Sequence, residues 1–378
     1  MARTRIGLDI GSTAVRIAEV TEGDRPAVLR LGQVPLPLGA VEAGEVRSTD
    51  QVATAIERLR EVSGIDVTDV HIGVENTKVV VREVTLPWLP EKELRAALAF
   101  QAQDYIPMTA DEAVMDCELL GETQVDGQRM QRLLLVAAQR AAVNDQIDAV
   151  EAAGLLPVSV DLAPFAAVRA TASGDPDEVQ ALVDIGGHIT SVVLHRGNSV
   201  RLVRILAIGG RNVTATIARN LGIDEGAAEL MKRGETDGSG VEGLDRERAR
   251  QAALDGARPL VEDIASTIEF SIRQEADLDV RRIVLTGGGS HLDGLTELLD
   301  ARIHLPVERA RVFGRARSRL VPELGAMVEA GGSFSVAIGL ALGGVGDAPQ
   351  GRAANKERKA REKAESGGRR GRRGKGEA

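Results

Sequence analysis

Two short segments each place an aspartate and a glycine in a turn between strand-like runs. The first is Asp9-Ile-Gly-Ser-Thr, within RIGLDIGSTAVRIAEV (5–20), and the second is Asp184-Ile-Gly-Gly, within ALVDIGGHITSVVLHR (181–196). Glycine lets a backbone approach a ligand closely. Successive backbone N–H groups can surround phosphate oxygens, and an aspartate can hold a hydrated Mg²⁺. One such hairpin is common as a plain turn, but two that face each other predict a grip on the phosphates of a nucleotide.

A third segment, RIVLTGGGSHLDGLTELL (282–299), runs from an apolar strand into three glycines. This spacing is neither that of a dinucleotide-binding turn nor that of a phosphate loop ending in Gly-Lys-Ser/Thr. Three consecutive glycines exceed what a tight turn needs, so they predict a flat ligand against bare backbone. Ser290 is predicted to cap the next helix, with Asp293 three residues later. The buried side of that helix is expected to carry Leu292, Leu295 and Leu299.

Other kinds of chemistry lack their residues in this chain. The single Cys117 excludes an intramolecular disulfide, and it lies in a strand-like run with no histidine nearby. The five histidines show no HExxH spacing, and no GxSxG sequence is present. The sequence therefore gives no support for a zinc site or for a nucleophilic hydrolase.

The composition favours helices layered on sheets. The 378 residues are 43% hydrophobic but only 2% aromatic, so the apolar mass is mostly aliphatic. This length is enough for two sizeable domains or one bilobed domain. The start, MARTRIGLDI, lacks the apolar core of a signal peptide, and the apolar run at 336–346 is too short and glycine-rich to span a bilayer. We therefore expect a cytoplasmic protein.

The net charge of −9 conceals a basic C-terminal segment. Residues 352–378 hold eleven Lys and Arg and four Glu, a charge of +7 that leaves −16 on the remainder. With almost no apolar residues, residues 347–378 are predicted to be disordered, with a helical stretch at 353–365. A solvated extension is the favoured role, with contact to an acidic partner as the alternative. No aromatic residues interleave the basic ones, which counts against specific nucleic-acid binding.

Hydrophobic periodicity and turn residues predict alternating strands and helices. Gly64 is expected to end a first helix, and Pro90 to begin another that ends before Pro107. Superposing Asp9 on Asp184 also superposes Gly11 on Gly186, so the two halves are expected to share one architecture, divided near 171–178. Strands are predicted at 5–10, 14–20, 27–34, 71–75, 79–87, 113–121 and 132–139, on both sides of the turn within 181–196, and at 282–286, and helices at about 52–63, 90–106, 141–153 and 164–172.

The order of these elements resembles the superfamily of actin, sugar kinases and Hsp70. Its two phosphate loops would be 7–16 and 182–191, and its adenosine segment 284–290. The resemblance also implies connecting helices near 161–172 and 335–342. Within it, residues 5–345 resemble the PilM family of type IV pilus assembly proteins, which is related to the division protein FtsA. The resemblance is carried by IGLDIGSTAVRIAEV, PLPLGAVEAGEVRSTDQVATAIERL, EKELRAALAFQAQDYIPM, ILAIGGRNVTATIARNLGIDEGAAELMKR and VLTGGGSHLDGL.

The resemblance implies a bilobed α/β, actin-like fold, a ribonuclease H-like unit used twice, with an inserted subdomain of the FtsA/PilM type. The first lobe would be 1–85 with 151–172, the insert 86–150, the second lobe 178–346 and the tail 347–378.

The resemblance also implies a site for ATP or ADP with Mg²⁺, which Asp9 and Asp184 would hold through water. Arg16 stands where relatives usually have lysine, and its planar fork differs from an ammonium group. Glu229 and Lys232 would reach the base and ribose; without the resemblance, an exposed ion pair is the better interpretation of these two. The phosphates would meet Gly11, Ser12, Thr13, Arg16, Gly186, Gly187 and Thr190, and the adenosine would meet Gly287, Gly288, Gly289 and Ser290.

The implied function is a cytoplasmic scaffold of the pilus machine. Such a protein binds the N-terminal peptide of an inner-membrane PilN-like partner, which recruits it to the inner face of the membrane. The peptide groove would lie between the first lobe and the insert. ATP hydrolysis is expected to be weak or absent, because Ala163 stands where hydrolases of the superfamily carry a water-positioning side chain, and Asp161 lies two residues away.

Three alternatives stay open at this stage. One is a protein that keeps the fold but has lost nucleotide binding, which the presence of Asp9, Asp184 and the TGGG segment counts against. A sugar or acid kinase of the same fold would need a base for its hydroxyl acceptor, and Ala163 and the small size count against it. An FtsA-like division or filament protein would be expected to end in an amphipathic membrane helix, which the nearly apolar-free tail does not resemble.

Overall fold

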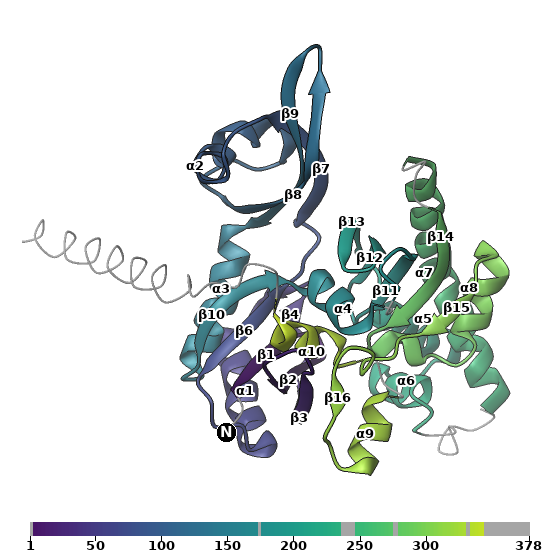
Figure 1. The fold of residues 1–378 in the computed structure, drawn as a ribbon. Helices are drawn as coiled ribbons and strands as arrows, with labels where there is room; N and C mark the ends of the chain where they lie inside the picture. The colour runs from purple at the N-terminus through teal and green to yellow at the C-terminus, as the bar shows by residue number, and fades with distance from the viewer. Residues whose placement is uncertain (1–2, 173–174, 236–245, 275–278, 330–332, 344–378) are drawn as a thin grey trace, which may run out of the picture.

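The computed structural model describes residues 3–172, 175–235, 246–274, 279–329 and 333–343, and the predictions for 347–378 lie outside these ranges. Two lobes are each built around a mixed sheet (Figure 1). A third, smaller sheet stands apart from both. The architecture is therefore α/β with two lobes, as expected.

The first sheet has the strand order β10-β6-β1-β2-β3-β16. Strands β1, β2 and β3 form an antiparallel unit, whereas β6 is parallel to β1, β10 is parallel to β6, and β16 is parallel to β3. The bounds are β1 (Thr4–Ile10), β2 (Ala14–Thr21), β3 (Ala27–Pro35), β6 (Asp69–Val74), β10 (Leu156–Leu162) and β16 (Arg317–Ser318), with a small hairpin of β4 (Val41–Glu42) and β5 (Glu45–Val46).

Helix α1 (Thr49–Ser63) buries Val52, Ile56 and Leu59, in one hydrophobic core with β1, β2 and α3 (Arg140–Ala152). It ends at Gly64, as predicted, where φ is +63° and the glycine N–H donates to the Arg60 carbonyl over 3.1 Å. A residue in this left-handed conformation at the end of a helix is most often glycine.

The second sheet repeats the order of the first. Its order is β13-β12-β11-β14-β15, with an antiparallel β11–β12–β13 unit and with β14 and β15 parallel to β11. This confirms the predicted duplication. The bounds are β11 (Val179–Ile185), β12 (Thr190–Arg196), β13 (Ser199–Leu206), β14 (Val280–Thr286), β15 (Val307–Arg309), α5 (Gly210–Leu221), α6 (Glu225–Lys232), α7 (Arg246–Gln274), α8 (Leu295–Ile303) and α9 (Pro322–Glu329).

Helices α4 (Ala163–Thr171) and α10 (Ser335–Leu342) pack against each other between the two sheets (Figure 1). A β-carbon on Gly339 would lie 1.7 Å from the Ala166 carbonyl oxygen, and one on Gly7 would lie 2.0 Å from that of Ala337. Both glycines are therefore required by the close approach of α10 to α4 and to β1.

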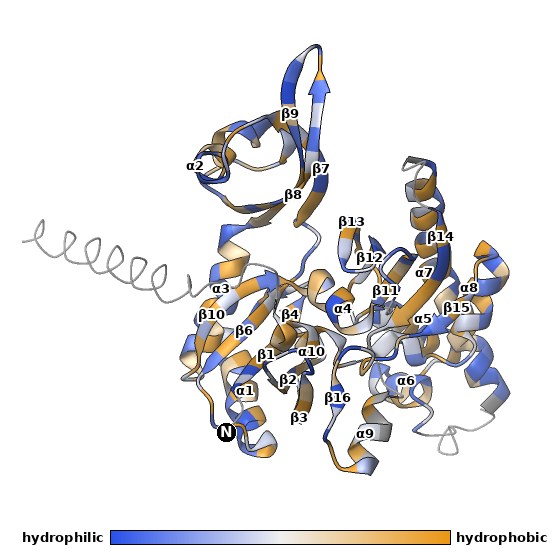
Figure 2. Cartoon of the chain, viewed as in Figure 1, coloured by the Kyte–Doolittle hydropathy of each residue, from blue (hydrophilic) through white to orange (hydrophobic). Residues whose placement is uncertain are grey.

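The third sheet has the order β7-β9-β8, and its long β8–β9 hairpin is hydrophilic at the outer end (Figure 2). Helix α2 begins after Pro90, as predicted, and places Leu94 and Leu98 against Leu133 and Leu135 in a core of its own. The bounds are β7 (Val80–Pro87), α2 (Glu91–Gln101), a 3₁₀ turn (Gln103–Tyr105), β8 (Ala113–Val125) and β9 (Gln128–Gln139).

The predicted helix cap at Ser290 was wrong. A 3₁₀ turn (Gly288–His291) follows the glycines, and α8 begins only at Leu295, behind Gly294 with φ at +82°. The Ser290 hydroxyl instead donates to the Gly287 carbonyl over 2.7 Å. The glycines allow this extra turn, and Leu292, Leu295 and Leu299 are still buried as expected.

Candidate functional site

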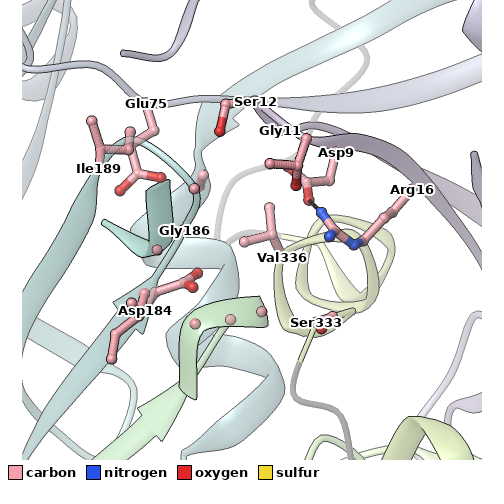
Figure 3. A pocket seen from close by; sticks show the side chains of 18 of the residues that line it. Asp9, Gly11, Ser12, Arg16, Glu75, Asp184, Gly186, Ile189, Ser333 and Val336 are labelled. Carbon is pink, nitrogen blue, oxygen red and sulfur yellow. Dashed lines mark hydrogen bonds and ion pairs between the residues drawn. The ribbon is translucent and has the colours of Figure 1, made fainter. Parts of the chain in front are cut away.

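A cleft of about 350 Å³ lies between the lobes, where the carboxyl ends of β1, β6, β11 and β14 meet (Figure 3). Parallel strands bring residues that follow them to one edge of a sheet, and ligands of α/β proteins commonly bind there. The cleft brings together all but two of the residues predicted for the site. These are Asp9, Gly11, Ser12, Thr13, Arg16, Asp184, Gly186, Gly187, Glu229, Lys232, Gly287, Gly288 and Gly289.

Thr190 and Ser290 do not line the cleft. Both are buried, and each hydroxyl donates to a backbone carbonyl, Thr190 to that of Ile208 over 2.8 Å and Ser290 to that of Gly287. Their hydroxyls satisfy the backbone around the turns instead of pointing into the open space.

The two hairpin turns have the same backbone hydrogen bond and contact each other across the cleft. The Gly11 N–H donates to the Ala14 carbonyl over 3.1 Å, and the Gly186 N–H donates to the Ile189 carbonyl over 2.9 Å. A β-carbon on Gly187 would lie only 2.6 Å from Ser12 Oγ. The sequence therefore allows the turns to touch, which closes one end of the cleft with backbone N–H groups and the hydroxyls of Ser12 and Thr13.

The carboxylates of Asp9 and Asp184 face each other across this cleft. Burial raises the pKa of Asp9, which the charge of Arg16 and its contact over 3.4 Å only partly offset. Burial, with the negative charge of Asp9, raises the pKa of Asp184 to about 7. Like charges held together in a partly dehydrated site resist ionisation. The pair is therefore an unfavourable arrangement in the absence of a cation.

A third carboxylate, that of Glu75, enters the same cleft and was missed from the sequence. Burial raises its pKa well above the ordinary value, and the charges of Asp184 and Asp9 add to this effect. Glu75 directly follows β6, whereas Asp9 and Asp184 are the next-to-last residues of β1 and β11, and no glycine-rich turn marks Glu75 in the sequence. The only signal available in the sequence is an acid directly after an apolar strand.

Replacement of Asp184 by asparagine should change how stability depends on pH. The folded-state pKa near 7 lies above the ordinary value of 3.8, so the native protein binds more protons than the unfolded chain between these values. Stability in the absence of nucleotide and Mg²⁺ should therefore fall as pH rises from 4 to 7, by roughly 2–4 kcal/mol. Asp184→Asn removes this loss, so its melting temperature should exceed that of the wild type by several degrees at about pH 8 and match it near pH 4. Parallel melting curves of the two proteins across this range would contradict the assignment.

The glycine segment after β14 forms one wall of the cleft. A β-carbon on Gly287, whose φ is +81°, would lie 2.2 Å from Asp184 Oδ1, and one on Gly289 would lie 2.3 Å from Ile185 Cγ2. A β-carbon on Gly288 would meet only Ser333 Oγ, at 4.0 Å. Two of the glycines are thus needed to pack the segment on β11, and Gly288 leaves a flat face toward open space.

Glu229 and Lys232 form the ion pair that their spacing allows, and the pair lines the cleft. Lys232 Nζ donates to Glu229 Oε2 over 2.6 Å and to Thr214 Oγ1 over 2.8 Å. Burial acts to raise the pKa of Glu229, but the hydrogen bonds and charge of Lys232, with those from Thr214 and Arg233, lower it to about 2. The two side chains are therefore held in fixed positions at the outer wall.

Ala163 lines the cleft at the start of α4, whereas Asp161 does not. The Asp161 carboxylate pairs with Arg169, and both side chains line a separate groove. Asp161 is thus turned away and does not replace a water-positioning group at residue 163.

Comparisons with known proteins agree on one family. The family model for the type IV pilus assembly protein PilM matches residues 7–345. Among solved structures, the PilM-PilN type IV pilus biogenesis complex is similar, with 30% identity, a TM-score of 0.77, and coverage of 90% of this chain and 98% of that chain.

More distant similarity extends to other proteins. The cell division protein FtsA of Pseudomonas aeruginosa is 28% identical over 348 residues, which cover 80% of this chain and 81% of that protein. The ethanolamine utilization protein EutJ of Carboxydothermus hydrogenoformans has the same fold, at 16% identity, a TM-score of 0.56 and 91% coverage of both chains. Within the described ranges, no helix is both long and apolar enough to cross a bilayer.

Proposed function

The chain belongs to the PilM family of type IV pilus assembly proteins, and from this premise we propose that it is an actin-like scaffold that holds MgATP or MgADP in the cleft and a partner peptide in a second groove. The main support for nucleotide binding in the cleft is the contact between the two hairpin turns at Gly187 and Ser12. Proteins of this fold generally bind a nucleotide with Mg²⁺.

The donor set of the cleft fits a hydrated Mg²⁺. Mg²⁺ prefers carboxylate oxygens and keeps several of its waters. Burial raises the pKa of both Asp9 and Asp184, and the charge of Asp9 raises that of Asp184 further, so a cation between them would favour the ionised carboxylates. In the part of the chain that the structure describes, no three acidic, histidine or cysteine side chains are clustered closely enough to hold a metal directly. We infer that Asp9 and Asp184 would hold the ion through its waters, and the ion would neutralise phosphate charge.

The remaining cleft residues suit the other parts of a nucleotide. The N–H groups and hydroxyls of Ser12, Thr13 and Gly187 would surround the phosphates, with Arg16 as the cation beside them. The flat face at Gly288 would lie against adenosine, and the fixed Glu229–Lys232 pair would reach the base and ribose. The low pKa of Glu229 keeps its carboxylate ionised, so the carboxylate can accept hydrogen bonds from ribose hydroxyls.

The peptide groove that we propose has a volume of about 900 Å³ and lies between β8 and β10. Each is an edge strand of its sheet in the described part of the chain, so each has backbone groups free to pair with an extended peptide. Leu119 on β8 is 59% exposed, and Val160 on β10 is 39% exposed. Charged side chains of both signs line the same groove, among them Arg315 and Glu118.

The partner is a PilN-like inner-membrane protein, since the similar solved structure is a PilM-PilN complex. Its N-terminal peptide would occupy this groove and recruit the scaffold from the cytoplasm to the inner face of the membrane. The division into lobes 1–85 with 151–172 and 178–346, around an insert at 86–150, stays a prediction. The family match favours this pilus role over a kinase or a division protein.

Leu119→Asp and Val160→Asp should each weaken binding of the PilN-like peptide by about tenfold or more, because each substitution places a charge in an apolar contact. Both residues are exposed, so the fold should be unaffected. The matched control is Val125→Asp, on the same strand at the hairpin end and 46% exposed, outside the groove. Fluorescence anisotropy with a labelled peptide measures the affinities. Equal losses at Leu119 and Val125, or none at Leu119 and Val160, would contradict the groove assignment.

A further inference from the structure

The position at the start of α4 has no side chain that could orient water. Ala163 contributes only a methyl group to the cleft, and the Asp161 carboxylate is held by Arg169 at the separate groove. A group that acts on a water beside the phosphates must therefore come from another element.

The strand next to β10 is β6, and the residue that follows it, Glu75, supplies a carboxylate level with Ala163. Strands β6 and β10 are parallel, and Val74 pairs with Leu162. Glu75 and Ala163 are consequently equivalent residues at the ends of adjacent strands, which are spaced about 4.8 Å apart. Both residues line the cleft, and the short side chain of Ala163 leaves room beside it for the Glu75 carboxylate.

The backbone that carries Glu75 is fixed by the turn after β6. The Asn76 side chain accepts from the Lys78 N–H over 2.9 Å, and the Val79 N–H donates to the Asn76 carbonyl over 3.1 Å. Gly44, with φ at +81°, packs so closely that a β-carbon would lie 1.7 Å from the Glu75 carbonyl oxygen. The side chain therefore extends from a well-anchored position.

One oxygen of the Glu75 carboxylate has no hydrogen-bond partner among the residues that the structure describes. Glu75 Oε1 is buried and accepts no hydrogen bond from the described residues. Figure 3 shows that Glu75, Asp9 and Asp184 point from different strands toward one open space. A buried acceptor left unpaired is costly, and a water molecule in that space would satisfy it.

We infer that Glu75 orients and deprotonates a water molecule for hydrolysis of bound ATP, in the place of the side chain that residue 163 lacks. This inference rests on the proposed nucleotide site. Glu75 accepts a proton from the water as the water oxygen bonds to the γ-phosphorus. The bond between that phosphorus and the bridging oxygen breaks, its electron pair stays with ADP, and Glu75 then releases the proton to solvent.

Glu75→Gln keeps the size and polarity of the side chain but removes the base. The expected result is a fall in phosphate release of about tenfold or more, with affinity for a non-hydrolysable fluorescent ATP analogue within about threefold of wild type. Nucleotide recovered from the protein after gel filtration and denaturation should be ADP for the wild type and ATP for Glu75→Gln. The melting temperature should not fall, because the substitution removes repulsion between carboxylates.

The matched control is Glu42→Gln, which neutralises an exposed carboxylate outside the cleft and should behave as the wild type. Equal phosphate release by the wild type and Glu75→Gln would overturn the inference. So would a wild type that binds the analogue but releases no phosphate above background. Failure of the wild type to bind the analogue at all would instead overturn the proposed nucleotide site, and the inference with it.

Discussion

Asp9→Asn and Asp184→Asn should each weaken Mg²⁺-dependent ATP binding by about tenfold to a hundredfold. Asparagine keeps the shape of each side chain but removes the negative charge that a hydrated Mg²⁺ requires. The effect should be largest with Mg²⁺ and small in EDTA, where the carboxylates repel the phosphates. Titration of a fluorescent ATP analogue with and without Mg²⁺ measures it.

Asp184→Asn should change protein stability and nucleotide affinity in opposite directions, which distinguishes a binding site from a pair of residues that only stabilises the fold. The substitution should stabilise the nucleotide-free protein at neutral pH while it weakens binding, since the repulsion that it removes is what a cation would otherwise relieve. The control is Asp293→Asn, whose side chain is 87% exposed and lies outside the cleft. Unchanged affinity in both Asp9→Asn and Asp184→Asn would exclude this metal position.

Gly339→Ala should strongly destabilise the protein. The new β-carbon would lie 1.7 Å from the Ala166 carbonyl oxygen, a backbone atom that cannot move without separating α4 from α10. Overpacking of this kind costs about 3 kcal/mol or more. We expect a fall in melting temperature of roughly 10 °C, or loss of soluble protein.

The matched control is Gly325→Ala, another glycine within a helix. Its β-carbon would meet only Ser318 Oγ, at an ordinary 3.4 Å, so the change should be neutral or stabilise by up to about 1 kcal/mol. Thermal unfolding followed by circular dichroism compares the two variants. Equal stability of Gly339→Ala and wild type would show that α4 and α10 do not pack as closely as described.

Local signals were sufficient to predict that the two halves share one architecture, whereas the actin-like fold itself was implied by the family resemblance. Glycine at the end of α1 and proline before α2 marked boundaries that the structure confirms. The repeated Asp-Ile-Gly turn indicated the duplication, which the matching strand orders of the two sheets confirm.

Features that depend on contacts between distant segments could not be predicted. Gly287 and Gly289 are glycines chiefly because they pack on Asp184 and Ile185, a reason visible only when β14 lies beside β11. Ser290 resembled a helix cap because its sequence spacing was correct, but the glycines permit a 3₁₀ turn first. Glu75 gave only the weak signal of an acid after an apolar strand, because its position beside Ala163 follows from the pairing of β6 with β10.

The central claim is that both hairpin turns and the glycine segment hold one nucleotide together, and hydrogen–deuterium exchange tests it most directly. Saturating MgATP should slow amide exchange in three segments at once, 10–14, 185–190 and 286–290, and Asp184→Asn should abolish the effect at the same nucleotide concentration. Protection of only one hairpin, or of none while the nucleotide is bound, would contradict the claim.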